Sequence, residues 1–209
     1  MAFAPFVPLR VLSSYSMLEG AIDPKDIAKL AKERGFPAIA ICDRNGLYGS
    51  TAFAGACVGE GVQPIVGALL GVARPGNEGG VEGAEPVVDY LPLFAQDEAG
   101  WQNLCHLVSR AHLDRPLEFE PHVAFEDLAG RTEGLIDLAF ACDLPLVATN
   151  PANFAEAHMH KAHDAMLCIA NSTQVDSEDR PRSNAEGFVK SAAMMGELFS
   201  DLPEATANT

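Results

Sequence analysis

Residues 6–20, Phe-Val-Pro-Leu-Arg-Val-Leu-Ser-Ser-Tyr-Ser-Met-Leu-Glu-Gly, begin with an apolar run and end in a polar loop. The run Phe6–Leu12 favours β structure, so it predicts a short buried strand. Alternate residues of a strand share one face, which places Pro8, Arg10 and Leu12 together. Since the loops after parallel strands carry the chemistry of a barrel, these residues decide what the chain can do.

The residues that follow alternate between helical and strand patterns. Asp23 and Pro24 suit the start of a helix that closes at Gly35. An apolar strand is expected at 37–42, a helix around 53–58 and another strand at 62–67. This order, with strands of the fully buried type, predicts an α/β fold with a parallel sheet.

The second half of the chain repeats these patterns less regularly. Strands are expected at 87–94 and 144–149, and helical segments at 98–111, 125–128, 158–170 and 191–199. The Gly-, Glu- and Pro-rich stretch 74–86 has no apolar period and is expected to be a surface loop. Neither it nor the glycines at 55–61 have the spacing of a phosphate-binding P-loop.

Composition narrows the possible functions. The 209 residues carry a formal net charge of −15, which argues against a broad DNA-binding face, because such faces neutralise phosphates with Lys and Arg. The cysteines are spread out as Cys42, Cys57, Cys105, Cys142 and Cys168, which predicts reduced thiols and a cytoplasmic protein. No apolar stretch is long enough to span a bilayer.

The opening resembles the PHP (polymerase and histidinol phosphatase) domain family, in the form that begins bacterial DNA polymerase III alpha subunits. That form has alternating histidines on the first strand, followed by the motifs Ser-x-Tyr-Ser and Leu-x-Gly. Residues 13–20 match both of these motifs. Leu47-Tyr48-Gly49 and Pro64-Ile65-Val66-Gly67 also match, and the resemblance covers nearly the whole chain. It implies a PHP-type distorted TIM-like (β/α)7 barrel.

The resemblance also implies where metal ligands would stand. The corresponding residues here are Pro8, Arg10, Leu12, Asp43, Arg44, Leu69, Tyr90, Pro151 and Asn153. Proline and leucine have no donor atom, and arginine is a permanent cation. Asp43 is retained, but a single carboxylate cannot build a site that needs three or more ligands. We therefore expect a vestigial site without metal, cofactor or catalytic residue, in which Asp43 pairs with Arg10 or Arg44.

The remaining histidines offer a weaker candidate. His158, His160 and His163 form the one cluster, and on a helix the last two share a face. The cluster is either a metal site or the solvated start of a helix with one half-buried ring, and the sequence leaves this open. His106, His112 and His122 are isolated, which indicates surface or cap positions.

The family pattern is interrupted after Ile136. A segment on the order of two βα units of the barrel has no counterpart between Ile136 and Asp137. A real deletion would join Glu133–Cys142 into one helix. Residues 1–200 are then the PHP domain, and 201–209 begin a linker to a polymerase palm.

These features imply a domain of the replicative polymerase's alpha subunit that is itself inactive. Its expected partners are the rest of that subunit and the proofreading (epsilon-type) exonuclease subunit, for which it offers a docking surface. Direct DNA binding and membrane contact are not expected. The alternative is an active metal-dependent phosphoesterase or 3′–5′ exonuclease of the same family, which would need the lost ligands.

Overall fold

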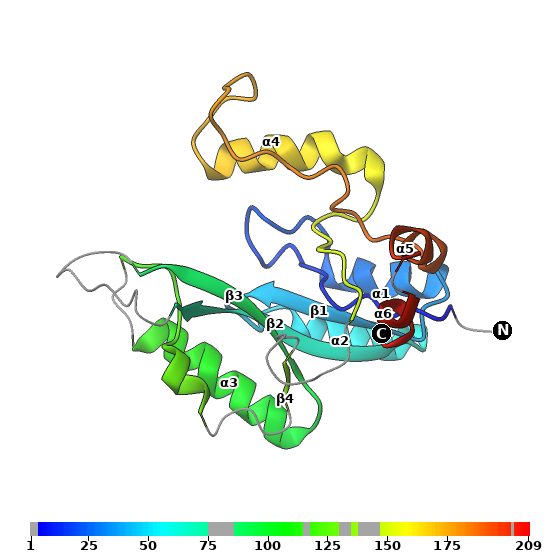
Figure 1. Cartoon of the computed structure of the whole chain (residues 1–209), viewed down its shortest axis with the longest axis horizontal. Helices are drawn as coiled ribbons and strands as arrows, with labels where there is room; N and C mark the ends of the chain where they lie inside the picture. The colour runs from blue at the N-terminus through cyan, green and yellow to red at the C-terminus, as the bar shows by residue number, and fades with distance from the viewer. Residues whose placement is uncertain (1–3, 75–85, 115–117, 130–134, 138–146, 202) are drawn as a thin grey trace. The chain divides into compact units, whose positions relative to one another are not determined.

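The computed structural model describes residues 4–74, 86–114, 118–129, 135–137, 147–201 and 203–209. They divide into two compact units, which are described separately (Figure 1). The first unit comprises Met1–Ile41, Tyr48–Pro64 and Pro145–Thr209, and the second comprises Cys42–Leu47 and Ile65–Leu144.

Two helices of the first unit form as their sequence predicts. Helix α1 (Pro24–Glu33) begins at Asp23, whose carboxylate accepts a hydrogen bond from the Lys25 amide at 2.9 Å. It packs against α2 (Ser50–Glu60). The apolar stripe of each helix is buried, with Ile27 and Phe53 fully enclosed, whereas Val58 points to solvent.

The predicted strand at 6–12 is not a continuous strand. It makes isolated parallel bridges, from Val11 to Ala152 and, just beyond it, from Ser13 to Ile22. The Pro8 carbonyl accepts from the Ala40 amide at 2.9 Å, but Pro8 has no N–H to extend a ladder. The described part of the predicted strand at 144–149, residues 147–149, also lies outside any ladder.

Short helices complete the first unit. They are η2 (Ala157–Met159), α4 (His160–Ala170), α5 (Ala192–Leu198) and α6 (Pro203–Ala207). Ser191 begins α5 by accepting a hydrogen bond from the Met194 amide. Ala205 of α6 is buried and its carbonyl accepts from the Ala148 amide at 2.8 Å. The segment expected to begin a linker is thus hydrogen-bonded within this unit, and the boundary at 200 stays a prediction.

A four-stranded sheet runs through the second unit in the order β1-β2-β3-β4. Its strands are β1 (Ala38–Arg44), β2 (Gln63–Ala73), β3 (Val88–Ala95) and β4 (Leu135–Asp137). The expectation of a wholly parallel sheet is wrong here, because β3 pairs antiparallel with both β2 and β4. A parallel β2–β3 pair would need a crossover element, and the stretch between them has no helical pattern.

The strand β4 also overturns the helix expected at Glu133–Cys142, at least over 135–137. The rest of that range lies outside the described residues, as do Cys142 and most of the loop expected at 74–86. The chain is α/β, as predicted. A closed TIM-like barrel stays a prediction.

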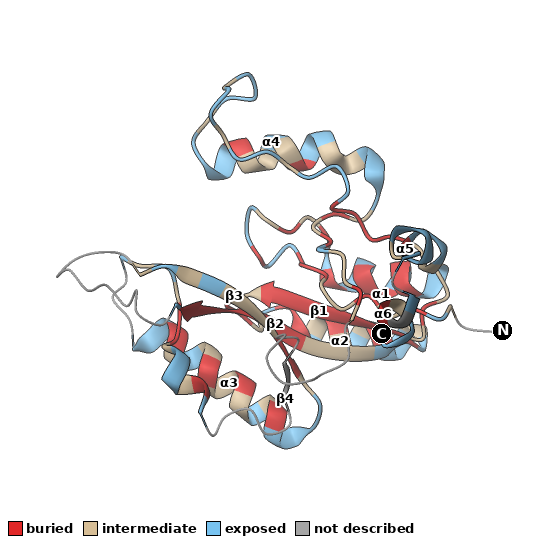
Figure 2. Ribbon diagram, viewed as in Figure 1, coloured by how far each residue is buried: buried red, intermediate tan, exposed pale blue. Residues whose placement is uncertain are grey.

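Helix α3 (Glu98–Leu113) lies against the sheet of the second unit (Figure 2). Leu128 of the 3-10 turn η1 (Phe125–Leu128) joins the same core. Asp97 begins α3 by accepting from the Gly100 amide at 2.8 Å. The helix buries Leu104, Leu107 and Ala111 against the strands. The core residues are Ala68, Leu70, Val72, Leu93, Leu104, Leu107, Ala111, Val123 and Leu128.

Candidate functional site

The second unit holds four of the predicted ligand positions on three strands. Asp43 and Arg44 end β1, Leu69 lies in β2, and Tyr90 lies in β3 opposite Gly71. Asp43 and Leu69 are buried, with 2% and 5% of their surface exposed. Leu69 therefore contributes an enclosed apolar side chain where the family resemblance implies a glutamate.

A cation occupies these positions of the second unit. The guanidinium carbon of Arg44 lies 4.1 Å from the centroid of the Tyr90 ring, within reach of a cation–π interaction. Its Nη1 also lies 3.2 Å from a carboxylate oxygen of Glu120. The chain thus fills these positions with a stacked and ion-paired arginine.

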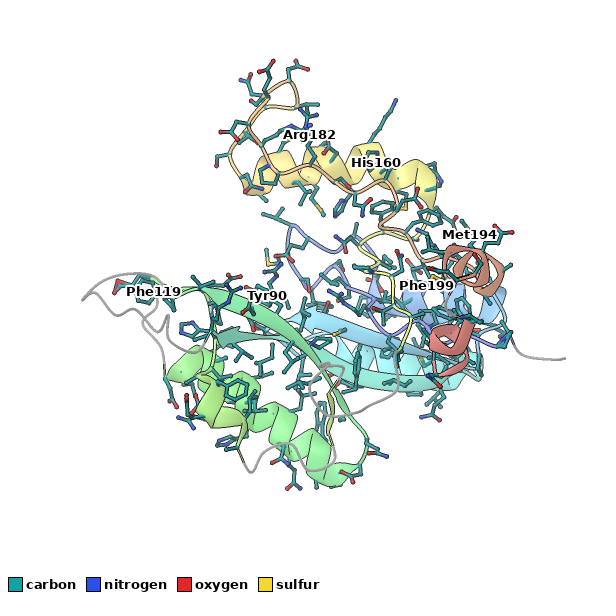
Figure 3. The ribbon with its side chains drawn as sticks, viewed as in Figure 1. Tyr90, Phe119, His160, Arg182, Met194 and Phe199 are labelled. Carbon is teal, nitrogen blue, oxygen red and sulfur yellow. The ribbon has the colours of Figure 1, made fainter. Side chains whose placement is uncertain are left out.

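The Tyr90 hydroxyl, labelled in Figure 3, is buried and has no hydrogen-bond partner among the described residues. Burial, followed by the nearby Glu120 carboxylate, raises the pKa of Tyr90 to about 12. The Glu120 carboxylate acts by its charge, since its position falls short of hydrogen-bond geometry. Tyr90 is therefore a neutral phenol that supports Arg44, and its oxygen is not available as an anionic ligand.

Asn45 organises the backbone behind this site. Its side chain accepts a hydrogen bond from the Gly71 amide and donates one to the Pro121 carbonyl, both at 2.7 Å. Its own amide donates to the Leu69 carbonyl, and its carbonyl accepts from Nε2 of His112 at 2.7 Å. Asn45 has φ 47, a left-handed conformation that asparagine tolerates. The Asn-Gly pair at 45–46 was the available signal for this turn, but nothing in the sequence indicated its partners.

The first unit holds the other predicted positions on two neighbouring extended segments. Around the Val11–Ala152 bridge, the Arg10 carbonyl accepts from the Ala152 amide and the Leu12 amide donates to the Ala152 carbonyl, both at 2.9 Å. Pro8 and Leu12 are buried, and Pro151 is exposed. Nε of Arg10 is buried and has no hydrogen-bond partner among the described residues.

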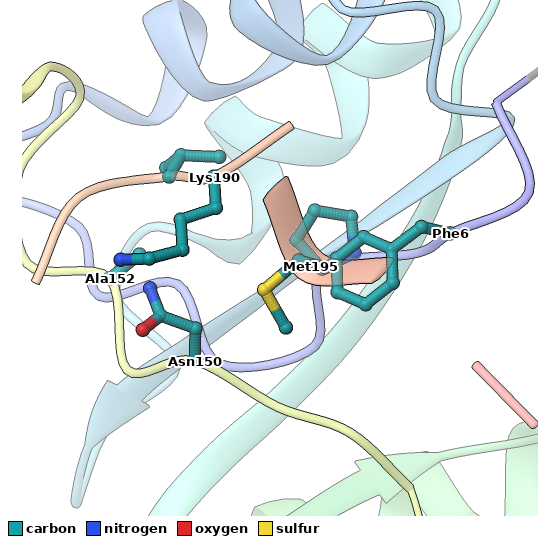
Figure 4. Close-up of a pocket in the computed structure, with 7 residues that line it drawn as sticks. Phe6, Asn150, Ala152, Lys190 and Met195 are labelled. Atoms are coloured by element: carbon teal, nitrogen blue, oxygen red, sulfur yellow. The ribbon is translucent and has the colours of Figure 1, made fainter. Parts of the chain in front are cut away.

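A small pocket opens beside the same segments (Figure 4). It encloses about 220 Å³, including space open to solvent, and its lining includes Pro8, Asn150 and Lys190. The Lys190 ammonium is already bound, since it donates to the Glu186 carbonyl at 2.6 Å and lies 4.1 Å from the Phe188 ring centroid. Asn150 donates to the Phe188 carbonyl at 2.8 Å. These polar groups hold the local fold and leave little to recognise a ligand.

The histidine cluster is built into the fold. His163 is buried, with Nδ1 2.7 Å from the Ser183 hydroxyl and Nε2 2.7 Å from the Glu19 carbonyl. Nε2 of His160 lies 3.1 Å from the Ser183 carbonyl. Both ring nitrogens of His163 are thus engaged, which argues against ligation. The expectation of a surface or cap position is wrong for His122, which is buried.

The four cysteines in the described residues are not placed as nucleophiles. Cys42, Cys57 and Cys168 are buried thiols outside any disulfide, and Cys105 is partly buried. Burial raises the pKa of Cys57 to about 11, so its thiol stays protonated at neutral pH.

The donor set does not fit a divalent cation. Among the described residues, no group of three or more His, Cys, Asp or Glu side chains is placed to hold a metal ion. Of the predicted ligand positions, Pro8, Leu12, Leu69 and Pro151 lack any side-chain donor. Arg10 and Arg44 add positive charge. We therefore assign no metal to this site. Among the same residues, no helix is long and apolar enough to cross a membrane.

Sequence comparisons place these observations in a family. The profile of the PHP domain matches residues 8–174. DNA polymerase III subunit alpha of Caulobacter vibrioides is 34% identical over 261 residues, and the alignment covers 98% of this chain and 23% of that protein. The same subunit of Escherichia coli is 29% identical over 264 residues, covering 98% of this chain and 22% of that protein.

Two features of these alignments concern length. The chain spans 22 to 23% of the length of these two relatives. The aligned length of 261 residues exceeds the chain's 209 by 52, so positions of the relatives have no counterpart here. The alignments do not locate these positions, and a deletion after Ile136 stays a prediction.

Comparison with solved structures gives only distant likenesses. An amidohydrolase from Chromobacterium violaceum aligns with 93% of this chain and 49% of its own, at 15% identity and a TM-score of 0.40. A metal-dependent phosphoesterase from Bifidobacterium adolescentis aligns with 51% of this chain and 32% of its own, at 14% identity and a TM-score of 0.39. We base no argument on these scores. The profile match and the alignments with the polymerase subunits show that the chain belongs to the PHP domain family.

Proposed function

We propose that this chain is a PHP domain without phosphoesterase activity that serves as a scaffold within a DNA polymerase III alpha subunit. The observation that carries the proposal is the Arg44 side chain, stacked on Tyr90 and paired with Glu120 at positions implied to bind metal. A fixed positive charge there opposes the cation that PHP hydrolysis requires. The net charge of −15 further supports a domain that does not itself hold DNA.

The alternative is an active metal-dependent phosphoesterase or 3′–5′ exonuclease. Both reactions need a cation to polarise the phosphoryl group and activate water. The two possibilities are separated by incubating the chain with Zn²⁺ or Mn²⁺ and either a chromogenic phosphomonoester or single-stranded DNA labelled at its 5′ end. We expect no turnover above buffer. Hydrolysis that a chelator abolishes and that co-elutes with the folded chain would establish the alternative.

We further propose that the proofreading exonuclease subunit docks on this domain. Apolar side chains on α5 support such a role, because Met194 and Leu198 are 41% and 55% exposed while Met195 is buried in the core. Figure 3 labels Met194 on this helix. We expect the exonuclease subunit of the same organism to co-elute with the chain. Met194→Glu with Leu198→Glu should weaken that complex, whereas Ile169→Glu, at an exposed position on α4, should not. Equal affinity of all three proteins would exclude α5 as the docking surface.

A further inference from the structure

Asn45 and Gly46 form an Asn-Gly pair inside the second unit. In an unfolded chain this pair is the one most prone to spontaneous deamidation, because glycine has no side chain to shield its backbone nitrogen from the amide of the preceding asparagine. Here both residues are buried, and only 4% of the surface of Asn45 is exposed. The fold thus encloses a reactive pair.

The reaction needs a freedom that the fold denies to Asn45. The backbone nitrogen of Gly46 must reach Cγ of Asn45, which requires the side chain to turn towards the next peptide unit. Both ends of the side-chain amide are held, because Oδ1 accepts from the Gly71 amide and Nδ2 donates to the Pro121 carbonyl, each at 2.7 Å. The Asn45 carbonyl is also held, 2.7 Å from Nε2 of His112. These contacts keep the side chain from reacting.

Gly71 allows these contacts to close. A side chain at this position would place its Cβ 2.6 Å from the Pro121 carbonyl oxygen and 3.3 Å from Oδ1 of Asn45. The shorter of these distances is well inside van der Waals contact and involves a backbone atom, so the segments would have to move apart. The protection of Asn45 therefore depends on a glycine 26 positions further along the chain.

We propose that Asn45-Gly46 is a latent modification site, silent in the folded chain and reactive when the second unit opens. In the open chain the Gly46 nitrogen bonds to Cγ of Asn45, the bond from Cγ to Nδ2 breaks, and ammonia leaves with the proton of the Gly46 amide. Water then adds to either carbonyl carbon of the succinimide ring and opens it. The product is aspartate or isoaspartate at position 45.

The product cannot restore the original contacts. A carboxylate has no N–H to donate to the Pro121 carbonyl, so two acceptor oxygens would face each other in a buried place, which costs stability. Isoaspartate also adds a backbone carbon to the turn that follows β1. Conversion therefore makes an opening of the second unit permanent and marks the chains that have opened. This modification lies beyond the proposed scaffold role and does not depend on metal binding.

The test is incubation of the whole chain at mildly alkaline pH, in buffer and in unfolding guanidinium chloride, followed by peptide mass spectrometry. We expect conversion at Asn45 to be at least about 100-fold slower in buffer, because it proceeds only through an open state populated at about 1% or less. Asn171-Ser172 is the internal comparison, since Asn171 is exposed at the end of α4. Its two rates should differ by less than about tenfold, because no opening is needed to reach it.

Two variants test the part played by Gly71. Gly71→Ala should speed conversion of Asn45 in buffer, whereas Gly55→Ala, at a helical glycine whose added Cβ would meet nothing within 4 Å, should not. If Gly71→Ala fails to fold, the wild type is followed across guanidinium concentrations. Conversion should then rise together with the fluorescence change of Trp101, the single tryptophan, which lies in α3 of the second unit.

Four results would overturn the proposal. They are equal rates at Asn45 in buffer and denaturant, no conversion in denaturant, an unchanged rate in a folded Gly71→Ala variant, and conversion that rises before the Trp101 signal changes.

Discussion

Arg44 and Arg10 stand at two positions where the family resemblance implies metal-binding histidines, and their surroundings differ. Arg44 stacks on Tyr90 and pairs with Glu120, so its charge is compensated within the second unit. In the first unit, Nε of Arg10 is buried and lacks a partner among the described residues. One substitution is compensated by its neighbours, and the other leaves a donor open.

Under our proposal that the metal site has been lost, the difference indicates that its two arginine positions changed in separate ways. A positive charge at a former ligand position can be neutralised locally, as at Arg44, and then contributes to stability. It can also leave a buried donor without an acceptor, which is a cost to stability, as at Nε of Arg10 among the described residues. The two cases predict opposite responses to mutation.

The largest expected effect concerns the backbone that supports Arg44. Asn45→Ala removes both side-chain hydrogen bonds, leaves the buried Gly71 amide unsatisfied and places alanine in a left-handed conformation. We expect a loss of about 3 kcal/mol of stability, measured by urea unfolding. Asn45→Gly keeps the conformation and should lose less. Equal losses would mean that the hydrogen bonds carry the whole effect.

The second prediction compares the two arginines directly. Arg44→Ala should destabilise the chain by about 1–2 kcal/mol, through loss of the cation–π contact and a partly exposed ion pair. Arg10→Met should be neutral within about 0.5 kcal/mol or stabilising, because it removes a buried Nε that has no partner among the described residues. Urea unfolding of both variants decides the matter. A loss at Arg10 as large as that at Arg44 would show that Arg10 is paired after all.

A smaller effect is expected at Tyr90 in alkali. Its pKa is raised from the usual 10.0 to about 12 in the folded state, so the unfolded chain loses the phenolic proton first. The stability that the neutral Tyr90 phenol contributes is fully present below pH 10 and is lost as the pH rises towards 12. The fall in Tm over this range should be shallower in Tyr90→Phe. Tyr48→Phe, at an exposed position, should behave as wild type.

Protonation of Asp164, which pairs with an arginine of the first unit, is expected to lower the Tm in acid. The Arg180 guanidinium binds the carboxylate through two contacts of 2.9 and 2.7 Å, and the Ser183 amide donates to it at 2.9 Å. The Arg180 and Ser183 contacts lower the pKa of Asp164 below its ordinary value. The stability that this ion pair contributes is therefore present above the ordinary pKa and is lost as the pH falls below it. The fall in Tm with decreasing pH should be shallower in Asp164→Asn and unchanged in Asp26→Asn. An equally steep fall in Asp164→Asn would show that the Asp164–Arg180 pair is open in solution.

Much of the local structure could be predicted because it depends on neighbours in sequence. The cap at Asp23, the helices that begin near residues 98 and 191, and the turn of helix at 125–128 were predictable from residue type and spacing. The prediction of a continuous strand at 6–12 was wrong. An apolar run favours β structure, but Pro8 has no backbone N–H to donate to a ladder. The prediction that β3 runs parallel to its neighbours was wrong, because the residue pattern of a strand carries no information about the direction of its partner.

The candidate site divides in the same way. The absence of ligands at Pro8, Leu12 and Leu69 could be read directly from residue chemistry. The contact of Arg44 with Glu120 could not, because the two are separated by 76 positions in the chain and only the fold brings them together. Burial of His122 was hidden for the same reason.

Our central proposal is that the metal site has been lost, and metal content tests it most directly. The chain would be equilibrated with Zn²⁺ and Mn²⁺, freed of unbound ions and subjected to elemental analysis. A variant that restores donors (Pro8→His, Arg10→His and Leu12→His) would be measured beside it. We predict no bound metal above the buffer level in the natural chain, whether or not the variant recovers any. Stoichiometric zinc or manganese in the natural chain, removed by a chelator with a fall in Tm, would contradict the account.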